Sequence, residues 1–393
     1  MSEAKSDDGA ETGRVRPPGR AVPSAATPSA PPSGPASGAP ASTAKAGKSA
    51  ANGAATAAKK RVEPAPLSPG MSFEKDLRQA EFELAELEEL AKTTHLDLSE
   101  ELARKRAHVD QLLHDTYANL DAWNRVNVAR HQDRPVAADY IAGFDESFEL
   151  HGDKVFGDDR AIYTGFARIE QQRFMVIAHR KGRTTKERLE CNFGCAHPEG
   201  YRKALRKMRL AEKLRLPIVC MINTPGAYPG IGAEERGQAA AIAENILAMF
   251  DLRTPILVLV IGEGGSGGAL GIGIGDRVLM MEHSYYSVIS PEGCAAILWK
   301  DGTRTADAAA ALKLTAPDLI ELKLIDGVVE EPAGGAHRDP AATVARVRAR
   351  IAEELRALLE RPLETLLAER RRRYRFAGAI PGRFPAPEGA GSY

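Results

Sequence analysis

Several features that would place this chain in a common class of protein are scarce among its 393 residues. Cysteine occurs only four times, at Cys191, Cys195, Cys220 and Cys294, with no secretory signal before them, so we expect reduced thiols in the cytoplasm. Cys191 and Cys195 are spaced to share a helix face, but the second close pair that a zinc site normally needs is missing. We therefore expect ordinary thiols and no metal site.

Excess charge and long apolar runs are also lacking. Lysine plus arginine number 53 and aspartate plus glutamate number 53, so net charge gives no reason to expect nucleic acid or a membrane surface as partner. No apolar run approaches the roughly 18 residues that span a bilayer. Hydrophobic residues make up 43% of the chain, which fits a globular protein.

The first 70 residues contain few large apolar side chains and are mostly Ala, Pro, Gly, Ser and Thr. Such a segment cannot bury enough surface to offset its conformational entropy, so we predict that residues 1–70 are disordered. A transit peptide is the alternative, and early acidic residues such as Glu3 and Asp7 count against it.

Helices are predicted in residues 71–120. Apolar residues step by four and three from Phe73 to Ala91, which is the spacing of one helical stripe, and Ser99 suits the N-cap of a second helix. A coiled-coil site for a partner and a helical hairpin packed on its own core both fit. The repeat is too short for a sustained coiled coil.

Short apolar runs alternate with helical stretches in a core that we place at residues 121–335. The predicted strands are 174–178, 218–222, 256–261, 278–281 and 286–289, and the predicted helices are 199–214 and 234–250. Strand, helix and strand in this order indicate right-handed parallel crossovers and an α/β fold.

The last segment, residues 336–393, is predicted to begin with a helix. Asp339-Pro340 is a suitable start, because proline is well tolerated in the first helical turn. The arginine run 370–373 would ordinarily lie on a solvated face, and docking of an acidic partner is the alternative.

The most informative segment runs from Ile261 to Leu270 and places five glycines directly after a buried strand. Glycine is used where the backbone takes positive φ or comes very close to another group. The peptide N–H groups of such a turn, with a helix N-terminus behind it, can stabilise an oxyanion, each donor contributing about 3–4 kcal/mol in the transition state. A tight turn that serves only packing is the alternative.

The same glycines also satisfy a dinucleotide-binding pattern. Gly262, Gly264 and Gly267 fit G-x-G-x-x-G, and Glu282 follows at the expected distance. A parallel crossover needs at least about 10–12 residues with a full helix. Because residues 268–274 hold only one or two helical turns, we reject a dinucleotide site.

A second loop, residues 223–236, is expected at the carboxyl end of a strand, where open α/β sheets bind ligands. Its Tyr228 either lines a pocket or packs on the loop. Glu234 and Glu235 suit the first turn of a helix, and this role fits better than acid–base catalysis.

Two further segments have a functional and a structural interpretation. Ser290 suits a helix N-cap followed by Pro291, and nucleophilic catalysis is disfavoured because no G-x-S-x-G elbow surrounds it. The basic residues His179, Arg180, Lys181 and Arg183 either meet coenzyme phosphates or form a solvated loop, which is the safer interpretation.

Together these segments resemble the alpha subunit of bacterial-type acetyl-CoA carboxylase carboxyltransferase. The resemblance covers residues 71–350 and is carried by many stretches: Phe156 to Asp159, His179 to Arg183, Asn192 to Gly194, Pro198 to Leu205, Thr224 to Gly230, Gly232 to Gln238, Gly262 to Leu270, Tyr286 to Cys294 and Leu324 to Asp326. No single motif carries it, so it is specific.

The resemblance implies a crotonase-like fold of stacked ββα units, with an N-terminal helical region and a C-terminal helix. It implies carboxyl transfer from carboxybiotin to acetyl-CoA, giving malonyl-CoA for fatty acid biosynthesis. The matching positions make the amides of Gly267 and Gly268 the catalytic oxyanion hole. They make Gly264, Gly265, Gly226, Ala227 and Tyr228 substrate-binding residues.

The resemblance also implies partners. A carboxyltransferase beta subunit would complete the site, with an alpha2-beta2 heterotetramer expected, and would carry the only zinc. A separate biotin carboxyl carrier protein would present carboxybiotin and a biotin carboxylase would use ATP, so this chain would bind no cofactor covalently. A stand-alone crotonase-type hydratase or isomerase and a non-catalytic scaffold are the competing functions. The choice between acetyl-CoA and propionyl-CoA stays open.

Overall fold

The structure, a computed structural model, describes residues 66–94 and 97–377. The disorder predicted for residues 1–70 therefore falls almost entirely outside the described residues, as does the end of the segment 336–393. Within the described ranges, no helix combines the length and the apolar character needed to cross a membrane.

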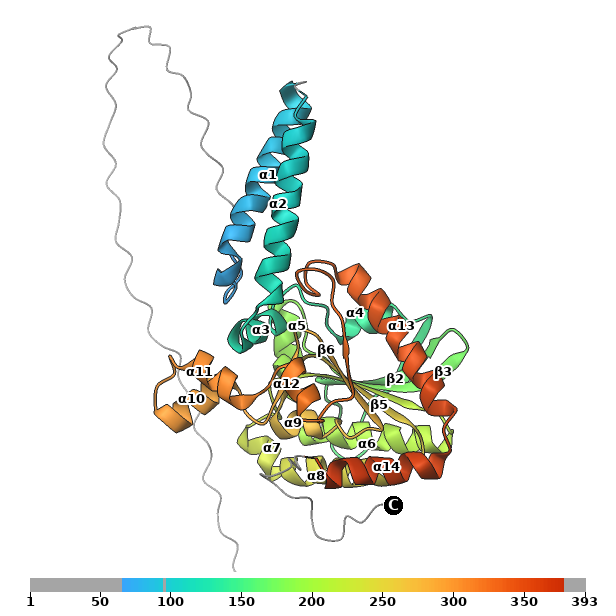
Figure 1. Cartoon of the computed structure of the whole chain (residues 1–393). Helices are drawn as coiled ribbons and strands as arrows, with labels where there is room; N and C mark the ends of the chain where they lie inside the picture. The colour runs from blue at the N-terminus through green and yellow to red at the C-terminus, as the bar shows by residue number, and fades with distance from the viewer. Residues whose placement is uncertain (1–65, 95–96, 378–393) are drawn as a thin grey trace, which may run out of the picture. The chain divides into compact units, whose positions relative to one another are not determined.

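One eight-stranded sheet forms the core (Figure 1). The strands are β1 (Glu146–Glu149), β2 (Ile162–Ile169), β3 (Gln172–His179), β4 (Ile218–Thr224), β5 (Ile256–Gly265), β6 (Arg277–Met281), β7 (Tyr285–Ser287) and β8 (Gly327–Val329). β1, β2 and β3 pair antiparallel, and every pairing from β3 to β8 is parallel. The predicted α/β class is confirmed, although β1, β2 and β8 were not predicted.

Helices cover both faces of this sheet. They are α3 (Ala122–Ala129), α4 (Ala137–Ala142), α5 (Thr185–Glu190), α6 (Pro198–Lys213), α7 (Ile231–Glu235), α8 (Gln238–Asp251), α9 (Ser266–Leu270), α10 (Pro291–Trp299), α11 (Thr305–Leu312), α12 (Ala316–Glu321), α13 (Pro340–Leu359) and α14 (Leu363–Arg375), with a short 3-10 turn at Asn192–Gly194. α6 and α8 pack on one face, α4 and α13 pack on the other, and α14 lies beside α8 (Figure 1). Alternate residues of β5 enter the two cores, so this strand is buried on both faces as its sequence predicts.

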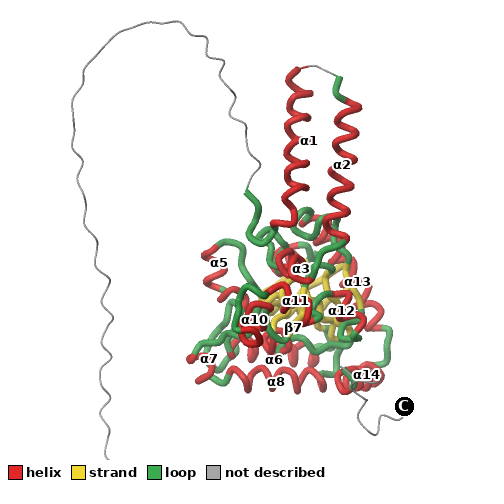
Figure 2. Tube along the Cα trace, turned by 60° about the vertical axis from the view of Figure 1, so that its left-hand side comes forward, coloured by secondary structure: helices red, strands yellow, loops and turns green. Residues whose placement is uncertain are grey.

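The N-terminal helical region is a hairpin. After a 3-10 turn (Ser72–Glu74), α1 (Lys75–Thr94) and α2 (Ser99–Ala118) lie side by side around their own small core, which includes Leu77 and Val109 (Figures 1 and 2). Ser99 is the first helical residue rather than the predicted N-cap. Leu98 occupies the N-cap without a side-chain capping bond, and the amide of Ser99 donates to the carboxylate of Asp97 (3.1 Å). Arg338 fixes the base of the hairpin through an ion pair with Glu74 (2.8 Å).

Two predicted helices differ from the observed ones. The stretch 234–250 is divided into α7 and α8 at Gly237, whose φ of +81° interrupts the helix. The C-terminal segment contains α14 as well as α13. Within α14, Arg370 is 1% exposed and ion-paired with Asp276 (2.6 Å), so the solvated face expected for residues 370–373 is wrong at this position. Its guanidinium also donates to the carbonyls of Met249 in α8 and of Leu252 and Thr254 just after it, which explains the burial.

Candidate active site

The glycine segment occupies the end of the central strand and the start of a very short helix. β5 extends to Gly265, four residues beyond the predicted end at Ile261, so only Gly267 and Gly268 lie in α9. The reason is close approach: a Cβ on Gly265 would lie 2.1 Å from the carbonyl oxygen of Pro225. Glycine therefore lets β5 continue against the loop that follows β4.

That loop also contacts the first turn of α9. A Cβ on Gly268 would lie 2.4 Å from the amide nitrogen of Ala227 and 2.4 Å from the carbonyl carbon of Gly226. The structure thus brings Gly226, Ala227, Gly264, Gly265, Gly267 and Gly268 together at the carboxyl edge of the sheet. Their catalytic and substrate-binding roles stay predictions.

The amides of the two predicted catalytic glycines are available for a ligand. α9 has no side-chain N-cap, and the first amides of a helix have no intrahelical acceptor. None of the described residues accepts a hydrogen bond from the N–H of Gly267 or Gly268. Gly268 is buried and Gly267 is half-buried, so the polar groups are partly shielded from water.

A cavity of about 510 Å³ opens beside Gly267. Most of its lining is apolar and includes Leu270, Val278, Tyr286, Leu319 and Tyr374, and the cationic residues Lys323 and Arg373 also line it. A Cβ on Gly267 would have no neighbour within 4 Å, so this position has open space. Small-molecule sites have this character, an apolar hollow with a few polar groups at one end.

Tyr228 lies apart from this cavity. Its ring stacks on His197, with centroids 4.0 Å apart, and a Cβ on Gly230 would lie 2.4 Å from it. The ring thus packs on its own loop and on His197, and the substrate-binding role of Tyr228 stays a prediction. Glu234 and Glu235 lie in the exposed helix α7, Glu234 in its first turn, as the capping interpretation expects.

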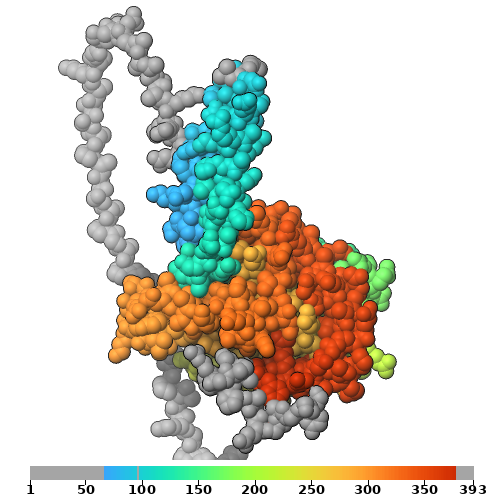
Figure 3. All heavy atoms as spheres, viewed as in Figure 1, coloured from blue at the N-terminus to red at the C-terminus, as the bar shows by residue number. Residues whose placement is uncertain are grey.

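Ser290 has the predicted capping role. Its Oγ accepts a hydrogen bond from the amide of Gly293 (3.1 Å), and Pro291 is the first residue of α10. Figure 3 shows the outer surface of α10 and α11.

The four cysteines are free thiols, and the described residues contain no cluster of three or more His, Cys, Asp or Glu that could hold a metal ion.

The basic residues 179–183 form a solvated loop only in part: His179 is buried, Arg180 and Lys181 are half-buried, and Arg183 is exposed. Arg180 pairs with Glu149 (2.9 Å), and Arg183 and Lys181 also have carboxylate partners. His179 is fully buried next to the Gly268 backbone. Burial lowers the pKa of His179 to about 3, although the Gly268 backbone raises it slightly, so this imidazole is neutral at physiological pH.

An ion cluster around Glu263 is the feature that sequence reasoning missed. Glu263 is buried within the glycine segment, and its carboxylate accepts from Arg130 Nε (2.6 Å), from the hydroxyl of Tyr285 (2.8 Å) and from Lys181. Arg130 also pairs with Glu292 (2.5 Å). A lone acid inside a glycine run after a buried strand was the available signal, because a buried carboxylate must find partners.

Comparisons with known proteins agree on one family. A family model described as acetyl co-enzyme A carboxylase carboxyltransferase-like matches residues 70–378, which extends past the limit of 350 drawn from the motifs and includes α14. An acetyl-coenzyme A carboxylase carboxyl transferase subunit alpha from Rhodopirellula baltica is 53% identical over 318 residues, covering 79% of this chain and 98% of that protein. The corresponding subunit from Geobacter metallireducens is 52% identical over 306 residues, covering 78% and 96%.

Solved structures are more distant. A transcarboxylase 12S structure with hydrolysed methylmalonyl-coenzyme A bound has a TM-score of 0.48 and 19% identity, and covers 60% of this chain and 42% of that one. The sequence matches therefore carry the family assignment.

Proposed function

Because this chain belongs to the family of acetyl-CoA carboxylase carboxyltransferase alpha subunits, we propose that it supplies half of an active site that carboxylates acetyl-CoA. The carboxyl group comes from carboxybiotin, and the product is malonyl-CoA for fatty acid biosynthesis. The observation that carries this proposal is the pair of unengaged amides at Gly267 and Gly268 beside an apolar cavity.

These two amides act on the ureido oxygen of carboxybiotin. When the N–C bond to the carboxyl group breaks, CO₂ leaves and the electron pair stays on the biotin ring, where negative charge builds on that oxygen. Preorganised N–H donors stabilise such charge without reorganisation, each contributing about 3–4 kcal/mol. The biotin nitrogen then takes a proton from the methyl group of acetyl-CoA, and the resulting enolate attacks CO₂.

The beta subunit supplies the second half of the site, where it stabilises the enolate oxygen. In this proposal the biotin nitrogen is the proton acceptor, and no side chain of this chain is assigned as the base. Biotin arrives on a separate carrier protein, ATP is used by a separate biotin carboxylase, and zinc belongs to the beta subunit. We expect an alpha2-beta2 assembly in the cytoplasm.

Reconstitution tests this function. The full chain is mixed with the beta subunit from the same cell. The reaction is run in reverse, from malonyl-CoA to free biotin, and the release of acetyl-CoA is measured. We expect almost no turnover from either chain alone and turnover from the mixture. Full activity from the isolated chain, or none from a stable complex, would overturn the two-subunit proposal. Running propionyl-CoA against acetyl-CoA in the forward direction decides the acyl preference.

A further inference from the structure

Three side chains hold the carbonyl groups that follow the predicted oxyanion hole. The hydroxyl of Tyr201 donates to the carbonyl of Gly268 (3.2 Å), and the amide of Asn245 donates to the carbonyl of Gly271 (2.9 Å). The hydroxyl of Tyr374 donates to the carbonyl of Gly273 (3.2 Å) and accepts from the amide of Gly275 (3.0 Å). These donors come from α6, α8 and α14, three helices that are far apart in the sequence.

The backbone cannot hold this segment without help. α9 has only five residues, and a helix this short is unstable unless other parts of the protein fix it. The helical hydrogen bonds of α9 are incomplete. The N–H of Gly271 donates to the carbonyl of Gly267 (2.9 Å), but the N–H of Ile272 donates to the carbonyl of Ala269 (3.3 Å) and not to that of Gly268. The Tyr201 hydroxyl takes the place of that missing backbone donor.

The donors are suited to a fixed position rather than to chemistry. Tyr201 and Asn245 are fully buried. A Cβ on Gly271 would lie 2.6 Å from the ring of Tyr201, so the ring and the backbone are in close contact. Burial raises the pKa of Tyr201 far above its ordinary value, and the hydroxyl therefore remains a protonated donor across the working pH range.

We propose that Tyr201, Asn245 and Tyr374 are positioning residues for carboxyl transfer. By holding the carbonyls of Gly268, Gly271 and Gly273, they fix the peptide groups that follow these three residues, and the first of these peptide groups adjoins the amide of Gly268 through its Cα. The amides of Gly267 and Gly268 are thereby kept in place before negative charge develops on the substrate. This inference rests on the proposed function, because it assigns these side chains to the same oxyanion hole.

Preorganisation is the physical reason that such contacts matter. An oxyanion hole works because its donors need no reorganisation as charge develops, and a displacement of about 1 Å can cost about 100-fold in rate. Loss of one of these side-chain hydrogen bonds leaves the amides of Gly267 and Gly268 in the chain and only loosens their position. The expected penalty is therefore smaller than for loss of a donor and appears in turnover rather than in substrate binding.

The test replaces Tyr201 with phenylalanine in the reconstituted complex. Tyr201→Phe keeps the ring in contact with Gly271 and removes only the hydroxyl. We expect kcat to fall by about tenfold, with KM for malonyl-CoA changed less than twofold. The matched control is Tyr140→Phe, because Tyr140 is also fully buried, and among the described residues its hydroxyl bonds only to the sulfur of Met281 (3.2 Å), on the other face of the sheet. The control should keep kcat.

Tyr374→Phe is the second variant, and it tests the positioning roles if Tyr201→Phe does not fold. It should lower kcat several-fold with KM held. A kcat per folded complex equal to wild type in these variants overturns the positioning roles and leaves the proposed function standing. Equal losses in both tyrosine variants and in Tyr140→Phe point to general destabilisation and also overturn it. An inactive wild-type complex overturns the proposed function itself and this inference with it.

Discussion

Lys181 and Glu263 form an ion pair that connects the loop after β3 to the carboxyl end of the central strand, β5. Glu263 also accepts hydrogen bonds from Arg130 and Tyr285, so its buried carboxylate has partners from three other segments. The strand that leads into α9 is therefore fixed by charge on one side, in addition to backbone pairing with β4 and β7. Loss of that charge has a predictable cost.

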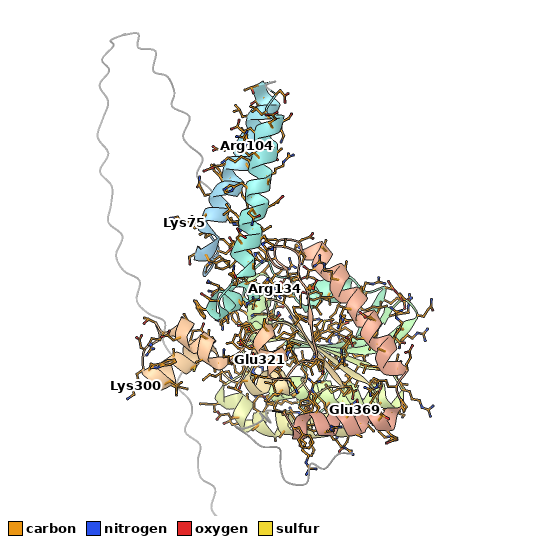
Figure 4. The ribbon with its side chains drawn as sticks, in the orientation of Figure 1. Lys75, Arg104, Arg134, Lys300, Glu321 and Glu369 are labelled. Carbon is orange, nitrogen blue, oxygen red and sulfur yellow. The ribbon has the colours of Figure 1, made fainter. Side chains whose placement is uncertain are left out.

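Glu263→Gln should lower the free energy of unfolding by about 3–5 kcal/mol. In the variant Arg130 keeps its ion pair with Glu292, whereas Lys181 loses its carboxylate partner. Burial, with a further contribution from Arg130, lowers the pKa of Lys181 to about 7, so an unpaired Lys181 is costly in this largely buried place, and breaking one side of such a pair is strongly destabilising. Urea denaturation followed by circular dichroism measures the change. Glu321→Gln is the control, because Glu321 is exposed at the end of α12 (Figure 4). Equal stability of both variants would contradict the importance of this cluster.

The two predicted catalytic glycines should respond differently to the same added methyl group. Gly267→Ala has open space and replaces a helical glycine, so stability should hold or rise by up to about 1 kcal/mol. Gly268→Ala would place its Cβ 2.4 Å from the backbone of Gly226 and Ala227, so it should destabilise by about 1–3 kcal/mol as an overpacked site. Thermal unfolding of the two variants measures this contrast.

Activity should separate these glycines further. Gly267→Ala is expected to lose about tenfold or more in kcat/KM although it is folded, because the methyl group occupies the space beside the oxyanion donors. Carboxyl transfer by the reconstituted complex is the measurement. A stable Gly267→Ala variant with wild-type turnover would remove Gly267 from the catalytic assignment.

Stability should fall as pH drops below about 6.5. Burial lowers the pKa of His179 and of His337 to about 3, so both are neutral in the folded chain while their unfolded counterparts bind protons below pH 6.5. Each histidine should lower the free energy of unfolding by roughly 2–3 kcal/mol between pH 6.5 and pH 4.5, and this decrease should level off near pH 3. Burial opposes ionisation of Glu331, but Arg134 brings its pKa to about 2, so its contribution is lost only below pH 4.5.

Denaturation curves at several pH values check this window. His337→Gln should flatten the loss between pH 6.5 and pH 4.5, because the variant has no imidazole to protonate when the chain unfolds. His114→Gln removes a histidine whose side chain is exposed and should leave the curve unchanged. A stability that rises as the pH falls through this window would be incompatible with neutral buried histidines.

The sequence predicted the parallel core well because buried strands and caps have strong local signals. β3, β4, β5 and β6 were located from apolar runs, and the capping positions Ser290 and Asp339 were located from the prolines that follow them. The antiparallel strands β1 and β2 were missed. β1 is mostly exposed and contains two glutamates, so it has no apolar run to detect.

The candidate site was predictable only in its glycines. Close backbone approach, as at Gly265 and Gly268, leaves a direct mark in the sequence because only glycine fits. Long-range contacts leave no such mark. Arg370 was predicted on a solvated face and Lys181 in a solvated loop. Their carboxylate partners, Asp276 and Glu263, are distant from them in the sequence. The tyrosine donors to the α9 loop were missed for the same reason.

The helical hairpin should be tied to the rest of the protein mainly through Arg338. Its guanidinium pairs with the fully buried Glu74 (2.8 Å) and with Glu81 (2.5 Å), whereas Arg78, which also pairs with Glu74 (3.4 Å), belongs to the hairpin itself. Arg338→Ala leaves the Glu74 carboxylate buried without this partner, so it should destabilise the hairpin by about 3 kcal/mol. Hydrogen exchange should then accelerate in α1 and α2 while β4 and β5 keep their protection. Arg104→Ala, on the exposed part of α2 away from the sheet (Figure 4), should change neither region, and uniform acceleration across the chain would refute a local role for Arg338.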